Sequence, residues 1–208
     1  EAVQDRSLER DDRGLQPREQ GRRVISIPSE IRAWVRHSLS QPSQHFGGLP
    51  ACPYAQPAFE RGEVSVILTD RLGRILTLKN KLPPQGDQTY VIAWTRPERM
   101  SPEQLERWVE RHNEQHGGIW LMGFHPDADE QDGIPAVPVE IESDYAVILM
   151  QRLETVVRAA ARLAGTDYYE GYTDAEWREI ARRDECARDP ALRAPLEADR
   201  AADLPDGE

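Results

Sequence analysis

The sequence has few cysteines and no long apolar run, and both shortages exclude classes of protein. Only Cys52 and Cys186 occur in 208 residues, which excludes a small scaffold held together by disulfides. We expect two free thiols in a reducing, cytoplasmic compartment, although a disulfide between them stays open. No apolar run approaches the roughly 20 residues that cross a bilayer, so no membrane association is expected. A glycine-rich phosphate loop, a dinucleotide fingerprint and a Cys-x-x-Cys pair are also missing, so no cofactor is predicted.

Charged residues are abundant and biased toward acids. Asp and Glu number 37 against 26 Lys and Arg, which gives a formal net charge of -11. Proteins that bind nucleic acid need clustered cations, so this balance does not predict a nucleic-acid partner, although a local arginine patch would escape the average. Hydrophobic residues make up 38% of the chain and include five Trp, six Tyr and three Phe. That content is sufficient for one hydrophobic core.

The composition divides the chain into three parts. Residues 1–26 alternate acids and arginines and contain few apolar residues, which predicts a charged N-terminal arm. Residues 27–183 are expected to form a single globular α/β domain. Residues 184–208 combine acids with prolines, which predicts an acidic C-terminal tail.

Four helices are predicted from apolar spacing and from capping residues. Apolar residues recur at helical spacing over 31–39, after Ser29 as N-cap. The run 101–104, SPEQ, has the form of a capping box, with proline at the first helical position. Apolar residues keep one face from 145 to 160, which predicts a long helix closed by a glycine at 165. Thr173 and Glu176 predict the start of a last helix.

The predicted strands are short. Runs of β-branched and aromatic residues predict strands at 64–69, 89–95 and 119–124. A fourth strand at 137–141 is an option, at a sheet edge because Pro138 cannot donate to a ladder. The segment 72–82 fits either a short helix or the return arm of a hairpin. Together these elements predict an α/β or α+β fold, in which a small mixed sheet packs against amphipathic helices.

The first candidate site residue is Cys52, which stands directly before a proline. A proline is favoured at the first position of a helix, so Cys52 would occupy the N-cap. There the helix dipole and the free N–H groups would lower the pKa of the thiol and make it reactive. The alternative is a buried cysteine that behaves as a small hydrophobic residue.

The second candidate comprises His125 and Asp127, just past the end of a predicted strand. Ligand-binding groups collect at strand ends in open α/β sheets. The imidazole would be an acid–base group, and Asp127 would orient it. The alternative is that Asp127 and Asp129 cap a turn, with His125 as an ordinary hydrogen-bonded residue. His112 and His116, one helical turn apart, give a third option, a transition-metal site completed by His125.

Three segments together resemble an uncharacterised bacterial domain family with no assigned activity. That family has a Gly-Leu-x-x-Cys-Pro-Phe-Ala run, then a strand ending in Asp, and later a strand ending in Phe-His-Pro-Asp. Residues 48–55, GLPACPYA, are similar to the first run, with Tyr54 in place of Phe. Residues 64–70 are similar to the first strand and residues 124–127, FHPD, to the last motif. The resemblance spans about residues 30–165 and implies that Cys52 and His125 face one site.

The sequence therefore predicts a thiol site, with Cys52 as nucleophile, His125 as its acid–base partner and Asp127 as orienting group. Such a site would act on a small-molecule substrate. The competing hypothesis is a non-catalytic interaction or assembly protein, whose charged termini dock onto protein partners.

Overall fold

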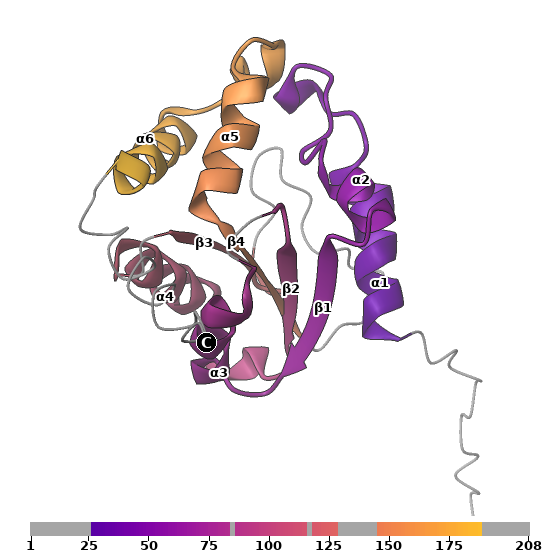
Figure 1. Cartoon of the computed structure of the whole chain (residues 1–208), viewed down its shortest axis with the longest axis vertical. Helices are drawn as coiled ribbons and strands as arrows, with labels where there is room; N and C mark the ends of the chain where they lie inside the picture. The colour runs from indigo at the N-terminus through magenta and orange to yellow at the C-terminus, as the bar shows by residue number, and fades with distance from the viewer. Residues whose placement is uncertain (1–25, 84–85, 116–117, 129–144, 189–208) are drawn as a thin grey trace, which may run out of the picture.

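A single mixed sheet organises the residues that the computed structural model describes, 26–83, 86–115, 118–128 and 145–188. The strand order is β1-β2-β4-β3. Strands β1 (Val64–Thr69) and β2 (Thr89–Trp94) are parallel, and β4 (Ala146–Arg152) runs antiparallel to both β2 and β3 (Ile119–Phe124). The predicted fold class and the first three predicted strands are thereby confirmed (Figure 1).

The connection from β1 to β2 decides the ambiguous segment. It contains helix α3 (Gly73–Leu78) and a 3-10 turn (Lys79–Lys81), so the hairpin alternative is wrong. Parallel neighbours need a crossover because a tight turn can join only antiparallel strands. Ile75 of α3 is completely buried and fixes the crossover against the sheet.

The predicted long helix after residue 144 is wrong in its first half. The structure has strand β4 there, and helix α5 (Leu153–Leu163) begins only after it. Strand β4 lies in the interior of the sheet and is covered on both faces, so that Val147 and Ile148 are both buried although they point to opposite sides. A strand buried on both faces is apolar at nearly every position and therefore also satisfies a helical spacing.

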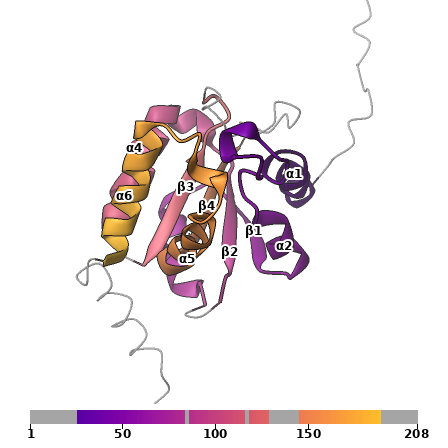
Figure 2. The ribbon, with the colours of Figure 1, turned by 90° about the horizontal axis from the view of Figure 1, so that it is seen from above.

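Two helical layers cover the sheet. On one face, α3 and α4 (Pro102–Gln115) enclose a core that includes Ile92, Trp94, Leu121 and Ile148. On the other face lie α1 (Ile27–Trp34), its π-helical continuation (Val35–Leu39) and α2 (Ala55–Glu60). Helix α5 and helix α6 (Asp174–Arg188) pack around Trp120 of β3, and α6 lies beside α4 (Figure 2).

The predicted helix starts are partly confirmed. The capping box before α4 is formed, since Gln104 Oε1 accepts from the Ser101 N–H at 2.8 Å and Ser101 Oγ accepts from the Gln104 N–H at 3.3 Å. Thr173 and Glu176 cap α6 in the same way. Helix α1 instead begins at Ile27, which places Ser29 inside it.

The last helix crosses one of the predicted segment limits. Helix α6 continues through Arg188, past the expected start of the tail at 184, and buries Cys186 against Trp120. Residues 1–25, the optional strand 137–141 and residues 189–208 lie outside the described residues.

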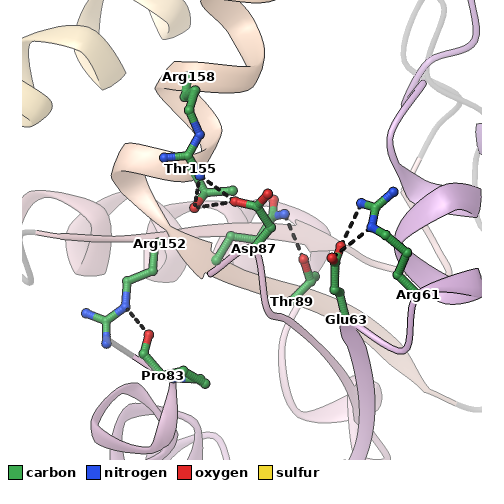
Figure 3. Close-up of polar contacts among 9 residues, drawn as sticks. Arg61, Glu63, Pro83, Asp87, Thr89, Arg152, Thr155 and Arg158 are labelled. Atoms are coloured by element: carbon green, nitrogen blue, oxygen red, sulfur yellow. Dashed lines mark hydrogen bonds and ion pairs between the residues drawn. The ribbon is translucent and has the colours of Figure 1, made fainter. Parts of the chain in front are cut away.

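Polar contacts fasten the start of β2 to β4 and α5 (Figure 3). The buried Arg152 donates to the carbonyl oxygens of Pro83 at 3.1 Å and Leu82 at 2.6 Å. Asp87 is held by the guanidinium of Arg158. The charged side chains at this end of the sheet are therefore bound to backbone carbonyls or to each other, and they stabilise the fold.

Candidate functional site

Cys52 lies in an apolar environment and does not cap a helix. Helix α2 begins at Ala55, with Tyr54 in the N-cap position, so the predicted N-cap position of Cys52 is wrong. The residue packs against the core between the sheet and α1, and its own N–H donates to the Leu39 carbonyl at 2.9 Å. Burial raises the pKa of the Cys52 thiol, although backbone hydrogen bonds from Tyr54 and Ala55 oppose the shift. The expected low-pKa thiolate is therefore not what the structure favours.

His125 uses both ring nitrogens to hold the backbone. Its Nε2 faces the carbonyl oxygens of Met100 at 3.0 Å and Pro97 at 3.2 Å, and its Nδ1 accepts the N–H of Asp127 at 3.1 Å. This pattern places the ring proton on Nε2, because carbonyl oxygens only accept. The imidazole side chain is 2% exposed. Neither nitrogen is left for a substrate, so the alternative of a structural hydrogen-bonded histidine describes this residue.

Asp127 contributes its backbone more than its carboxylate. The carboxylate lies 3.8 Å from the His125 Nδ1, beyond hydrogen-bond distance, and its side chain is 81% exposed. The backbone N–H of Asp127, rather than the side chain, orients the ring. Asp129, the other predicted capping residue, lies outside the described residues.

The structure brings His125 and Asp127 together but leaves Cys52 on the other side of the sheet. Phe124 points to the layer that contains Cys52, where its ring contacts Trp34 at a centroid distance of 5.3 Å. Successive residues of a strand point to opposite faces. His125 accordingly turns toward the segment that leads into α4. The three predicted residues do not assemble into one site.

The contacts of His125 instead shape a groove beside α4. They hold the 3-10 turn Pro97–Arg99 and Met100 against the end of β3, next to the first turns of the helix. The resulting hollow has a volume of about 260 Å³. We call it the arginine groove; it is lined by Arg99, Met100, Gln104, Arg107, Trp108 and Arg111.

The charges of α4 are arranged in two strips. Glu110 and Glu114 face α6 and lie 3.5 and 3.7 Å from the guanidinium of Arg182. Arg107 and Arg111 stand one turn apart on the groove side. Within the described part of the chain, no ion pair or side-chain hydrogen bond engages Arg107, Arg111 or Arg99. These three exposed guanidinium groups make the groove a local positive site in a chain of net charge -11, and Glu103, one turn before Arg107, offsets only part of that charge.

Trp108 forms the aromatic wall of the groove. The residue is half-buried, packs against the core beneath α4, and lies 4.2 Å from the His112 ring, centroid to centroid. The Nδ1 of His112 is 2.6 Å from the Trp108 carbonyl oxygen, so this nitrogen carries a proton. His116 lies outside the described residues, and among those described no three metal-binding side chains cluster.

A second hollow lies between α1 and α2 and has a volume of about 300 Å³. It contains Glu60 as well as two arginines, and the guanidinium of Arg32 is 5.8 Å from the centroid of the Phe59 ring. The carboxylate of Glu60 offsets part of the positive charge of the two arginines in this second hollow. The arginine groove is therefore the stronger site for an anion.

Sequence patterns did not identify the arginine groove, although one signal was available. Arg107 and Arg111 are spaced by four residues beside Trp108, which places them on one side of a helix. The contribution of Arg99 depends on the distant His125 contact and has no local sequence signature.

Comparisons with protein-family models, curated proteins and solved structures give no match for this chain. No helix among the described residues combines the length and apolar character needed to cross a bilayer. Function must therefore be inferred from the chemistry of the chain's own residues.

Proposed function

We propose that this protein is a non-catalytic binding protein that recognises an acidic segment of a protein partner through the arginine groove. The carrying observation is that three arginines, Arg99, Arg107 and Arg111, surround a half-buried tryptophan and form no ion pair with any other described residue. Guanidinium groups bind carboxylates through paired hydrogen bonds, so an acidic peptide supplies the missing partners.

The shape of the groove favours a peptide over an enclosed small molecule. Small-molecule sites usually enclose about 300–1,000 Å³, and the arginine groove, at about 260 Å³, lies below that range. Trp108 and Met100 offer apolar surface beside the charges. A partner segment that combines Asp or Glu with one aromatic side chain would use both kinds of surface.

Two of the three residues of the predicted thiol site support the non-catalytic alternative. Nucleophilic catalysis needs a thiolate and a base within hydrogen-bond reach of it. Here burial raises the pKa of the Cys52 thiol, and His125 directs both nitrogens to backbone groups. Neither group is arranged for that chemistry.

The test is binding of a fluorescein-labelled peptide of Glu and Asp residues with one Phe, followed by fluorescence polarisation. We expect affinity to fall with added salt, because the contacts are between exposed charges. The double variant R107E/R111E should weaken binding about tenfold or more, as expected for loss of about 1.4 kcal/mol. The matched control is R162E/R178E, which makes the same change in net charge on exposed positions of α5 and α6.

The control variant should change affinity much less than the groove variant. Equal weakening in both variants would mean that only net charge matters, and the proposal would then be wrong. Absence of peptide binding at low salt would also overturn it. Inorganic tripolyphosphate serves as the competing probe: groove-dependent binding of tripolyphosphate without peptide binding would replace the peptide by a phosphorylated ligand.

A further inference from the structure

The two edge strands of the sheet, β3 and β1, differ in whether their outward-facing backbone groups are hydrogen-bonded. At the β3 edge, the buried side chain of Asn113 mimics a neighbouring strand. Its Nδ2 donates to the Leu121 carbonyl at 3.0 Å, and its Oδ1 accepts the Leu121 N–H at 2.8 Å. Helix α6 packs on Trp120 beside it. This edge is closed to further strands.

Within the part of the chain that the structure describes, the β1 edge has no such protection. Thr89 donates to the Glu63 carbonyl at 2.8 Å, and Thr95 donates to the Thr69 carbonyl at 2.9 Å. In a parallel ladder, alternate residues bond to the same neighbour, so the odd-numbered residues of β1 face β2. The backbone groups of Val64, Val66 and Leu68 consequently point away from the sheet. No described residue hydrogen-bonds to them.

The side chains of β1 add to this opening. The strand reads VSVILT and contains no charge, proline or glycine, which are the residues that usually block edge pairing. Leu68 is 51% exposed and is one of two large hydrophobic side chains that are exposed among the described residues. An apolar, unpaired edge of this kind is a template for another strand.

We propose that two copies of this chain associate through antiparallel pairing of their β1 strands, which joins the two sheets into one. The edge is self-complementary under a two-fold axis perpendicular to the sheet. Such an axis places even-numbered residues of one copy opposite even-numbered residues of the other. The outward-facing backbone groups of the two copies therefore meet. Side chains from the same face also meet, because that axis keeps each face on its own side.

Charge complementarity selects the register. When Ile67 lies opposite Ile67 of the second copy, Leu68 lies over the second copy's Val66, and Glu63 approaches its Arg71. A shift that centres the pair on Val66 would instead place Glu63 opposite the second copy's Thr69, which carries no charge. Arg61 already pairs with Glu63 at 2.6 Å at the start of β1 (Figure 3), so the favoured register adds a second cation to that carboxylate.

The first test is the mass of the full-length protein by light scattering over a concentration series. We expect a dimer. Leu68→Pro should raise its dissociation constant about tenfold or more, because it removes one N–H per copy that points to the open edge. Leu68→Thr, which keeps the N–H, should retain most of the dimer. Circular dichroism checks that both variants are folded, and proline at 68 spares the bonds to β2, which use the residues on either side.

The second test is disulfide cross-linking, which decides the question even if the proline variant does not fold. In the favoured register the two copies of residue 67 form a non-hydrogen-bonded pair, with Cα atoms about 4.5 Å apart, within disulfide range. Ile67→Cys should therefore form a covalent dimer on mild oxidation. Ser65→Cys, on the same strand, is the matched control. In the favoured register residue 65 lies opposite residue 69 of the second copy, so the two cysteines at 65 would be too far apart to form a disulfide. A monomer at high micromolar concentration, a dimer indifferent to Leu68→Pro, or equal cross-linking of both cysteine variants would overturn the proposal, and none of these results bears on the arginine groove.

Discussion

Removal of the Asn113 side chain should destabilise the protein strongly, because two buried backbone groups would lose their partners. Asn113 is 2% exposed and Leu121 is 1% exposed. The variant Asn113→Ala leaves the Leu121 N–H and C=O unpaired. An unsatisfied buried polar group costs about 1–3 kcal/mol, so the expected loss is about 2–6 kcal/mol of unfolding free energy.

Urea unfolding followed by circular dichroism measures this loss. For a slope of about 1–3 kcal/mol/M, the midpoint should fall by about 1 M or more. Gln115→Ala, an exposed position on the same helix, is the control and should change stability by about 0.5 kcal/mol or less. A loss below about 1 kcal/mol in Asn113→Ala would show that Leu121 finds other partners, which would refute the closed β3 edge.

The variant Asn113→Asp adds a pH dependence with a defined sign. A protonated carboxyl can still donate to the Leu121 carbonyl, whereas the ionised form cannot and is also disfavoured by burial. The pKa of this carboxyl in the folded state should therefore rise. Its contribution to stability is present in acid and is lost as the pH rises through that value. A stability difference from the parent protein that does not vary with pH would contradict this reasoning.

Three further predictions concern the thiols, a glycine contact and a carboxylate. Burial raises the pKa of the Cys52 and Cys186 thiols, so iodoacetamide at pH 8 should label them about tenfold more slowly in the folded than in the unfolded protein; equal rates would contradict this. Gly171→Ala should lower the free energy of unfolding by about 1–3 kcal/mol, because its Cβ would lie 2.3 Å from the carbonyl oxygen of His45 in the 3-10 turn Gln44–Phe46. Thermal unfolding measures this loss, and Gly165→Ala, whose Cβ would meet nothing within 4 Å, should be neutral in that assay. Burial would raise the pKa of Glu176, but hydrogen bonds from Thr173 and His45 outweigh it and lower that pKa. The stability advantage of the parent protein over Glu176→Gln should therefore be full above the ordinary carboxyl pKa and vanish as the pH falls through the folded-state value. An advantage that persists in strong acid would argue against these bonds.

Local sequence signals predicted the elements whose stabilising contacts are themselves local. The strands at 64–69 and 119–124 and the capping boxes at Ser101 and Thr173 were predictable because each depends on neighbouring residues. The helix start at Ile27 was missed because Ser26 and Ser29 both precede apolar residues at helical spacing.

The errors concern features that depend on contacts distant in sequence. Strand β4 was predicted as helix because its place between β2 and β3 favours apolar residues at successive positions, and the run from Ala146 to Met150 also fits a helical spacing. The separation of Cys52 from His125 depends on which face each turns to, and no spacing in the sequence encodes that. Arg99 joins the arginine groove only through the contacts of His125 with the preceding turn.

The position of β4 also constrains how the chain folds as it leaves the ribosome. Strands β2 and β3 are synthesised first, yet each pairs with β4 along one of its edges and neither pairs with the other. Until Arg152 has emerged, β3 therefore has no strand partner, and β2 is paired only with β1 and keeps one open edge. Pairing between distant segments is slow, and unpaired strand edges favour misassociation, so the growing polypeptide is exposed to that hazard during this interval.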